Sequence, residues 1–252
     1  RRSSAAMTAR AFAAALVAAA AFPALGQDAC PQRGDLDTIF CDADGDLLAD
    51  RPTDASKLKN PDTLFFTNSP LDDPAVFNKL MQPFVDHLAS CTGRKVRYYD
   101  VYSSAAAIEA IRAGRMHLGT MSSGDTAFAV NVAGAHPLGI RGDANGPQGY
   151  QLWMIVRKDS PFQKLSDLKG KRVAHTTPSS NSGNLAPRAL FAAEGLVPDK
   201  DYKPLFSGKH ENSISGVAAG DYDAAPIAHD ILVRMAERGV VKADDFRVIW
   251  KS

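Results

Sequence analysis

The sequence has no excess of charge of either sign and contains few cysteines. Its 252 residues include 29 Lys and Arg against 28 Asp and Glu, which gives a formal net charge of +1 at pH 7. The basic residues are scattered along the chain, so the sequence does not indicate a nucleic-acid or polyanion surface. The three cysteines, Cys30, Cys41 and Cys91, are not spaced as zinc ligands are, and we expect no zinc site.

The motifs of common catalytic sites are also missing. There is no G-x-S-x-G turn, no phosphate-binding P-loop and no cluster of His and Cys residues at the spacing of catalytic metal ligands. Ser, His and Asp all occur, but hydroxyl-rich loops without a positioned base suit ligand binding better than catalysis. We therefore expect a binding protein without cofactor or metal, and keep a hydrolase as the alternative from the enzyme class.

The apolar run at residues 11–22 is too short to span a bilayer. Arg1, Arg2 and Arg10 precede this run, and small residues follow it just before Gln27. This pattern is typical of a secretory signal peptide, which we place at 1–26. No later segment of the sequence reads as a transmembrane helix, so we expect an exported protein without stable membrane insertion.

Residues 27–60 form an acidic extension that contains two of the cysteines. In an oxidising compartment Cys30 and Cys41 can close a small loop. Carboxylates alternate with other residues over 42–50, as they do in calcium-binding loops. Gly45 comes before the third Asp, however, and no Glu closes the loop. The favoured interpretation is a solvated, turn-rich segment, with a calcium site as the alternative.

From Pro61 onward, predicted strands alternate with predicted helices, a pattern typical of a mostly parallel α/β sheet. The chain has enough apolar residues, 45% of the total, for two lobes. The predicted strands span 63–66, 96–101, 116–119, 151–156, 172–175, 202–206, 222–225 and 246–252. Ligands of such sheets bind beyond the carboxyl ends of the strands. Polar side chains follow the first three strands there, namely Asn68, Tyr102, Ser122, Ser123 and Thr126.

Two helices are predicted in more detail. Residues 74–90 place Val76, Leu80, Phe84 and Leu88 on one face. A second helix follows the Ser-rich stretch 176–184 and ends at Gly195, with Ser182 as the expected N-cap and Pro187 in its first turn. A helix start presents unpaired N–H groups and a partial positive charge, so this stretch predicts an anion site, with an ordinary Ser-rich helix start as the alternative.

The chain contains a weak internal echo. Residues 108–114 and 214–220 share a pattern of Ile, apolar residue and Ala-Gly at a constant offset of 106 residues. This echo favours two similar lobes that face each other across a cleft, although such units also recur by chance in α/β proteins. We assign lobe 1 to 61–150 and lobe 2 to 151–252, with crossover strands near 151–156 and 246–252.

Four segments resemble the periplasmic solute-binding components of phosphate, phosphite and phosphonate ABC importers. They are Tyr102-Ser-Ser with Ile108-Glu-Ala-Ile-Arg-Ala-Gly114, Leu165-Ser-Asp-Leu-Lys-Gly-Lys-Arg-Val173, Ser180-Asn-Ser-Gly-Asn-Leu-Ala-Pro187, and Gly208-Lys-His-Glu-Asn-Ser-Ile-Ser-Gly-Val-Ala-Ala-Gly-Asp-Tyr-Asp223. The resemblance implies a two-lobed type II (venus-flytrap) fold, with mostly parallel sheets and helices on both faces. It also implies a phosphorus oxyanion held between helix starts of the two lobes and a permease as partner.

The resemblance also suggests site residues. Ser180, Asn181 and Ser182 match the family's Ser-Thr-Ser anion cradle, although Asn181 stands where Thr is usual. Tyr102 matches an aromatic hydroxyl donor of the first lobe. Relatives can present a second Tyr where this chain has the hydroxyl residues of 122–126.

Two further residues, His210 and Asp223, match polar groups on the second lobe's cleft wall. A protonated oxyanion offers an O–H donor that Asp223 can accept, whereas a fully ionised anion would be repelled. His210 has an alternative role, as a structural residue that bridges loops. These residues do not tell phosphate, phosphite and phosphonates apart.

Two questions on function and length follow from the resemblance. A periplasmic sensor lobe that reports to a membrane kinase would use the same fold as an importer's binding protein. The resemblance also implies a further C-terminal segment that completes lobe 1, which the present sequence does not contain, so we expect this part to be missing. The alternative is a naturally short protein whose extension, 28–60, covers the exposed face.

Overall fold

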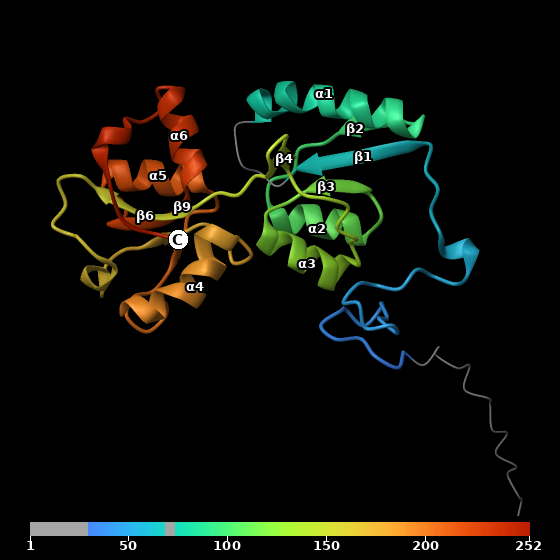
Figure 1. The fold of residues 1–252 in the computed structure, drawn as a ribbon, viewed down its shortest axis with the longest axis horizontal. Helices are drawn as coiled ribbons and strands as arrows, with labels where there is room; N and C mark the ends of the chain where they lie inside the picture. The colour runs from blue at the N-terminus through green and yellow to red at the C-terminus, as the bar shows by residue number, and fades with distance from the viewer. Residues whose placement is uncertain (1–29, 69–73) are drawn as a thin grey trace, which may run out of the picture.

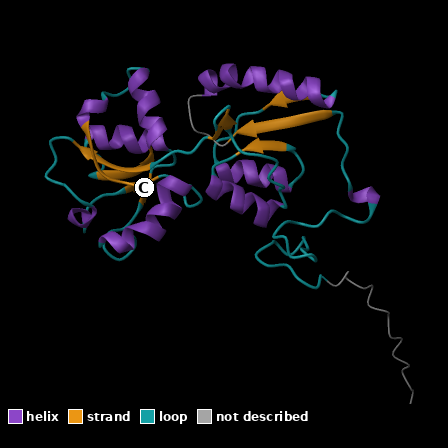
Figure 2. Cartoon of the chain, viewed as in Figure 1, coloured by secondary structure: helices purple, strands orange, loops and turns teal. Residues whose placement is uncertain are grey.

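The computed structural model describes residues 30–68 and 74–252, and the predicted signal peptide at 1–26 lies outside them. The described chain forms two α/β lobes side by side, with the N-terminal extension beside the first lobe (Figure 1). Figure 2 shows helices above and below the strands of each lobe. Among the described residues, the helices are too short or too polar to cross a bilayer.

The first lobe contains a parallel sheet with the strand order β2-β1-β3. Its elements in chain order are β1 (Thr63–Asn68), α1 (Pro74–Thr92), β2 (Lys95–Tyr98), α2 (Ser104–Arg112), β3 (Leu118–Thr120) and α3 (Ser123–Ala133). Helix α1 covers one face of this sheet, and α2 and α3 cover the other (Figure 1). The three predicted strands are therefore present, and they lie parallel as the alternation of strands and helices predicts.

The predicted apolar face of α1 is only partly correct. Leu80 is 65% exposed and Phe84 is 41% exposed, whereas the neighbouring Val85 is buried. Phe84 makes an edge contact with Phe66 of the sheet, at 5.4 Å between ring centroids. The helix therefore rests on the sheet along a stripe shifted toward Val85, and the side chain of Val76 lies outside the described ones.

The second lobe contains a mixed sheet. Its central sheet has the strand order β10-β6-β9, and all its pairs are antiparallel. The strands of this lobe are β6 (Leu152–Arg157), β7 (Ala174–His175), β8 (Leu205–Phe206), β9 (Ala224–Ala228) and β10 (Phe246–Lys251). β7 and β8 pair in parallel, and a parallel bridge from Val173 to Ala224 links them to β9. The two predicted crossover segments, near 151–156 and 246–252, are β6 and β10, and they pair with each other.

Helices cover both faces of this second sheet. They are the π-type turn Asn181–Leu185, α4 (Ala186–Leu190), the 3-10 turn Phe191–Glu194, α5 (His210–Ala219) and α6 (His229–Glu237). Ile214, Ile227 and Ile231 lie in the core under α5 and α6. Met154 and Phe191 lie in a separate core on the opposite face. Alternate residues of β6 and β9 therefore supply two cores, as expected for a strand buried on both sides.

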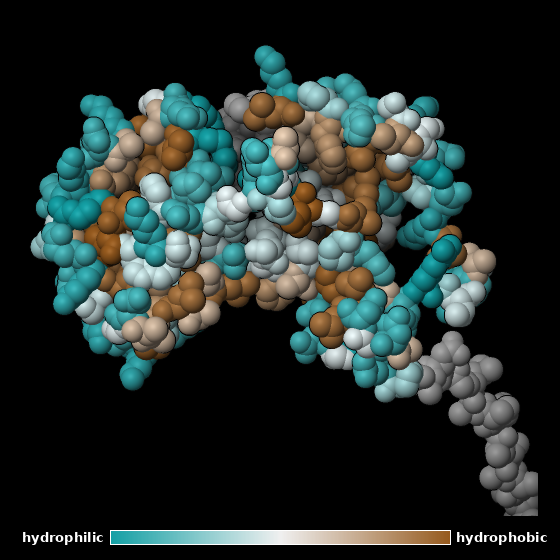
Figure 3. All heavy atoms as spheres, viewed as in Figure 1, coloured by the Kyte–Doolittle hydropathy of each residue, from teal (hydrophilic) through white to brown (hydrophobic). Residues whose placement is uncertain are grey.

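Short elements connect or flank the two lobes. They are the 3-10 turns Ala55–Lys57, Leu165–Leu168 and Ala243–Asp245, and a two-stranded antiparallel sheet formed by β4 (Gly142–Asp143) and β5 (Gly146–Pro147). Figure 3 shows a surface on which polar and apolar residues alternate. Leu138 and Ile140, next to β4, are 84% and 79% exposed.

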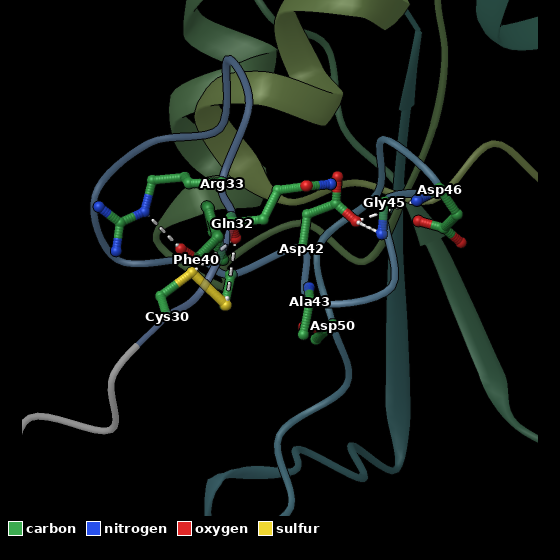
Figure 4. The surroundings of a disulfide bond; sticks show 10 residues. Cys30, Gln32, Arg33, Phe40, Asp42, Ala43, Gly45, Asp46 and Asp50 are labelled. Carbon is green, nitrogen blue, oxygen red and sulfur yellow. Dashed lines mark hydrogen bonds between the residues drawn. A yellow bond between two sulfur atoms is a disulfide. The ribbon is translucent and has the colours of Figure 1, made fainter.

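The N-terminal extension packs against α3. Cys30 and Cys41 form a disulfide (Figure 4), the pairing that the sequence allows. Cys91 is a free, exposed thiol. Leu36 is buried in a small cluster with Val130 of α3. The backbone N–H of Asp37 donates to Asn131 O at 2.7 Å, and the Asp37 carboxylate pairs with Arg112 of α2. The extension therefore covers the outer face of the α2–α3 pair.

The acidic segment 42–50 forms a tight turn around one carboxylate. Asp42 is buried and accepts the backbone N–H groups of Gly45 and Asp46 (Figure 4). It also accepts the backbone N–H of Leu47. Carboxylate oxygens of Asp42, Asp44 and Asp46 lie within 4.8 Å of one another. The segment is turn-rich, as the sequence predicts, and the backbone bonds account for the burial of Asp42.

Candidate ligand-binding site

The Ser-rich loop runs from β7 into the helical segment that contains α4. The Ser180 hydroxyl caps this segment, because it accepts the N–H of Gly183 at 3.2 Å. The predicted N-cap, Ser182, is therefore wrong by two residues. The segment begins earlier than expected, as a π-type turn, and places Ser182 inside its first turn, where only 2% of the residue is exposed. Pro187 and Gly195 occupy the predicted positions at the start and the end.

A buried hydrogen-bond network around His175 fixes the Ser-rich loop. His175 Nδ1 lies 2.9 Å from Asn184 Oδ1, and its Nε2 lies 2.7 Å from the Tyr202 hydroxyl. The Asn184 amide group donates to Pro178 O at 2.7 Å. Because Asn184 Oδ1 can only accept, His175 carries its proton on Nδ1 and accepts from Tyr202. Burial lowers the pKa of His175 to about 4, so the ring is neutral at pH 7 and the network fixes the loop.

His210 joins this loop to α5. Its Nε2 lies 3.3 Å from Ser182 Oγ, and its Nδ1 accepts the backbone N–H of Ala228 at 3.4 Å. Burial lowers the pKa of His210 to about 4, which keeps the ring neutral. A neutral ring that accepts at Nδ1 carries its proton on Nε2, so His210 donates to Ser182. This is the bridging pattern that the sequence left as the alternative role, and it directs the Ser182 hydroxyl proton toward another acceptor.

Asp223 does not join this group. Its carboxylate accepts the Arg172 backbone N–H and guanidinium, both at 2.9 Å. These bonds hold the pKa of Asp223 below its usual range. Asp223 precedes β9, whereas His210 contacts Ala228 at the other end of that strand. Five strand residues rise about 16 Å. The structure therefore does not place Asp223 where it could accept a proton from a ligand held by Ser182.

The predicted first-lobe residues gather at the ends of β1 and β3. Ser122 caps α3 by accepting the Asp125 N–H at 3.2 Å, and the Thr126 hydroxyl donates to Ser122 O at 2.9 Å. The Thr120 hydroxyl donates to Asn68 Oδ1. The structure thus brings Asn68, Ser122 and Thr126 to one edge of the sheet. Ser123, at the start of α3, is exposed, and Tyr102, after β2, is fully exposed.

Sequence reasoning missed Asp125. This carboxylate is 4% exposed and accepts the hydroxyls of Ser104 and Ser122, each at 2.9 Å, and of Ser179 at 2.5 Å. Ser104 and Ser122 belong to the first lobe, whereas Ser179 belongs to the Ser-rich loop of the second. An Asp in the first turn of a helix ordinarily stabilises the helix start. Because this local role explains Asp125 in the sequence, the sequence does not indicate its contact with the other lobe.

Gly124 allows this contact. A Cβ atom there would lie 2.2 Å from Ser179 O and 3.1 Å from Asn181 N. The start of α3 and the Ser-rich loop therefore touch through backbone atoms. Two surface hollows lie elsewhere, one beside Lys59 and His117 and one on α5 and α6. In this structure the predicted site is a packed junction between the lobes.

Comparisons with known proteins agree with this architecture. The family described as "ABC transporter, phosphonate, periplasmic substrate-binding protein" matches residues 66–252. The phosphate-import protein PhnD of Mycolicibacterium smegmatis is 30% identical over 220 residues, which cover 81% of this chain and 67% of that protein. The phosphonates-binding periplasmic protein of Escherichia coli is 28% identical over 174 residues, or 68% of this chain and 52% of the relative.

Solved structures show the same fold. A binding protein component of an ABC phosphonate transporter from Pseudomonas aeruginosa superimposes with a TM-score of 0.65 at 24% identity, over 75% of this chain and 65% of that one. PhnD1 from Prochlorococcus marinus, in complex with methylphosphonate, gives a TM-score of 0.66 at 21% identity, over 77% of this chain and 73% of that one. The chain therefore belongs to the family of periplasmic substrate-binding proteins of phosphonate ABC transporters.

Proposed function

We propose that this chain captures a small phosphorus oxyanion (a phosphonate, phosphite or phosphate) in the periplasm and delivers it to the permease of an ABC importer. The family match and the names of the relatives support this function. The methylphosphonate bound to a protein of the same fold supports the ligand class. In this proposal the chain acts as a monomer, with lobe 1 at 61–150 and lobe 2 at 151–252.

The observation that carries the proposal is the fixed Ser-rich loop. Its helix start and hydroxyls provide neutral donors, which bind anionic oxygens without a permanent cation. His210 donates to the Ser182 hydroxyl oxygen, so the Ser182 hydroxyl proton can be donated to a ligand oxygen. We infer that the second-lobe contacts are Ser180, Asn181 and Ser182, and that His210 acts through Ser182.

The first lobe supplies the opposite side of the proposed site. Its candidate contacts are Asn68, Tyr102, Ser122, Ser123 and Thr126. Tyr102 is fully exposed and therefore free to contact a ligand without loss of packing. Asp223 is not retained, because Arg172 already binds its carboxylate.

The Ser182–His210 pair supports binding rather than hydrolysis. A general base must accept the proton of its nucleophile. His210 receives the Ala228 N–H at Nδ1 and therefore carries a proton on the nitrogen that faces Ser182. In this arrangement the ring cannot take the Ser182 proton, so the pair orients a hydroxyl and does not activate a nucleophile.

A thermal-shift screen tests this function. The panel contains phosphate, phosphite, methylphosphonate and 2-aminoethylphosphonate. A ligand at 100 times its Kd adds about 2.7 kcal/mol to the free energy of unfolding, which raises Tm measurably. We expect at least one member to raise Tm. If none does, the proposed function is wrong.

A further inference from the structure

We propose that lobe 1 carries a separate ligand site, which takes a small organic anion whose charged oxygens are attached to a flat apolar body. The site is an open hollow of about 620 Å³ between the segment that leads into β1 and the turn from α2 to β3. No residue of the Ser-rich loop lines this hollow, so the inference goes beyond the proposed function and does not rest on it.

The hollow lies at the end of the first sheet that is opposite to the proposed site. Thr63 and His117, at the amino-terminal ends of β1 and β3, line it, whereas Asn68 and Thr120 end the same two strands. From Thr63 to Asn68 the strand rises roughly 16 Å. The volume is within the range of about 300–1,000 Å³ that small-molecule sites occupy. The hollow can therefore hold a small ligand that does not touch the Ser-rich loop.

The charged groups that line the hollow are all cationic. Lys59 precedes β1 and Arg115 follows α2, and both are exposed. A Cβ at Gly114 would lie 2.2 Å from Lys59 Nζ, so the ammonium group lies over the glycine. Within residues 30–68 and 74–252 neither cation forms a salt bridge, and no carboxylate lines the hollow. Two cations without a carboxylate between them attract an anion.

His117 adds a neutral donor to these cations. Its Nδ1 accepts the backbone N–H of Phe65 at 3.0 Å, so a neutral ring carries its proton on Nε2. Burial and, to a smaller extent, the charge of Lys59 lower the pKa of His117, which keeps the ring neutral at pH 7. The Nε2–H group, on the side of the ring away from β1, can donate to an oxygen of a ligand.

Two rings of the hollow provide a flat apolar surface. Phe65 and His117 stack with 5.7 Å between their centroids and 22° between their planes. Tyr99 fixes the Phe65 ring through an edge contact at 5.4 Å. Stacked rings can take a further ring by offset or edge-to-face packing. The hollow thus combines an aromatic surface with two cations, which suits an aromatic carboxylate better than an inorganic anion.

NMR titration of the full chain tests this site with three probes that separate charge from shape. Benzoate has a carboxylate and a ring, benzamide has nearly the same shape without the charge, and acetate has the carboxylate without the ring. We expect benzoate to shift the backbone amide signals of 63–65 and 114–117 to saturation. Benzamide and acetate should each bind at least about fivefold more weakly at these signals.

Variants of the two cations test the assignment of residues. Lys59→Gln and Arg115→Gln should each weaken benzoate binding about two- to fivefold, because exposed charges contribute modestly, and the double variant about tenfold. Lys57→Gln is the matched control, because Lys57 is an exposed residue of the preceding turn and does not line the hollow. This control should bind benzoate as the wild-type chain does.

Three results would overturn the inference. If benzamide shifts the signals of 63–65 and 114–117 as strongly as benzoate does, the hollow does not select an anion. If benzoate leaves these signals unchanged, the hollow is not a ligand site, even where signals of the Ser-rich loop shift. If Lys57→Gln weakens binding as much as Lys59→Gln does, the effect comes from the net charge of the chain. None of these results depends on whether the chain binds a phosphorus oxyanion.

Discussion

Ser182 Oγ lies 3.3 Å from His210 Nε2, and this pair connects the Ser-rich loop to the first residue of α5. Both residues are buried, and the Ala228 N–H fixes the ring from the other side. The Ser182 hydroxyl is therefore held in one orientation before any ligand arrives. Preorganised donors lose little entropy on binding, which is the physical basis of the site we propose.

Replacement of Ser182 should weaken ligand binding. Ser182→Ala removes one donor to a charged ligand, which corresponds to about 1.5–3 kcal/mol, or roughly a 10- to 100-fold higher Kd. Isothermal titration of the best ligand of the panel measures the change. Ser215→Ala is the matched control, because Ser215 is an exposed residue of α5, the same helix that begins with His210. Equal affinities of the Ser182 variant and the wild-type chain would place the site elsewhere.

Gly124 should tolerate no side chain. Its Cβ would lie 2.2 Å from Ser179 O, so Gly124→Ala has to push the Ser-rich loop away from α3. Overpacking of this kind destabilises by about 1–3 kcal/mol, and each kcal/mol lowers Tm by about 2–4 °C in a protein of this size. Differential scanning calorimetry measures the shift.

The control for this variant is Gly149→Ala, because no atom lies within 4 Å of a Cβ at Gly149. Ala is the better helix former by about 1 kcal/mol, so helix propensity alone predicts a higher Tm for Gly124→Ala. A Tm of the Gly124 variant at or above that of the wild-type chain would mean that the lobes do not touch there.

Two buried histidines should make the fold sensitive to acid. Burial lowers the pKa of His175 and of His210 from 6.5 to about 4. Between these values the unfolded chain binds protons that the folded chain does not, so stability falls as the pH falls from about 6.5 to about 4. A pKa of about 4 instead of 6.5 corresponds to on the order of 3 kcal/mol for each ring.

Urea unfolding between pH 7 and pH 4 measures this dependence. The free energy of unfolding of the wild-type chain should decrease steadily over the interval. His210→Gln should lower the stability at pH 7 but reduce the slope, because one of the two groups no longer titrates. A slope that is the same in both proteins would show that His210 is not buried as a neutral ring.

Much of the fold follows from local sequence patterns. The alternation of strands and helices, the stop at Gly195 and the pairing of Cys30 with Cys41 each depend on residues close together in the chain. The buried face of α1 differs from the predicted face because the periodicity of an amphipathic helix does not show which part of a broad apolar stripe packs on the sheet. The N-cap was misplaced because Ser180 and Ser182 both satisfy the capping pattern.

The site required contacts that no local pattern contains. Asp125 and Ser179 are 54 residues apart, and Ser182 and His210 are 28 residues apart. The sequence favours Asp223 as the ligand's proton acceptor because Asp223 ends a segment that carries the family resemblance. Its pairing with Arg172, 51 residues earlier, depends on the neighbouring positions of β7 and β9 in the sheet. Sequence therefore indicates the Ser-rich loop but not the carboxylate beside it.

The disulfide should hold the N-terminal extension on α3. Cys30 and Cys41 close a loop that carries Leu36, which is buried against Val130. Removal of a disulfide typically costs about 2–4 kcal/mol, here mainly as local opening of the extension. Trypsin should cleave after Arg33, inside this loop, several-fold faster in Cys30→Ser.

The control for the trypsin experiment is Cys91→Ser, which removes the free, exposed thiol. Ligand affinity should not change in either variant, because the extension contacts the outer face of α3 and not the Ser-rich loop. Equal rates of cleavage in Cys30→Ser and the wild-type chain would mean that the extension stays on α3 without its disulfide.

The central claim is that the Ser-rich loop binds a phosphorus oxyanion, and isothermal titration calorimetry of the full chain tests it most directly. Phosphate, phosphite, methylphosphonate and 2-aminoethylphosphonate are titrated separately into the wild-type chain and into Ser182→Ala. The account predicts that at least one of them binds, with one ligand per chain, and that Ser182→Ala weakens that binding by roughly 10- to 100-fold. The account is contradicted if none of the four ligands gives a binding isotherm, or if the tightest binder is held equally well by Ser182→Ala.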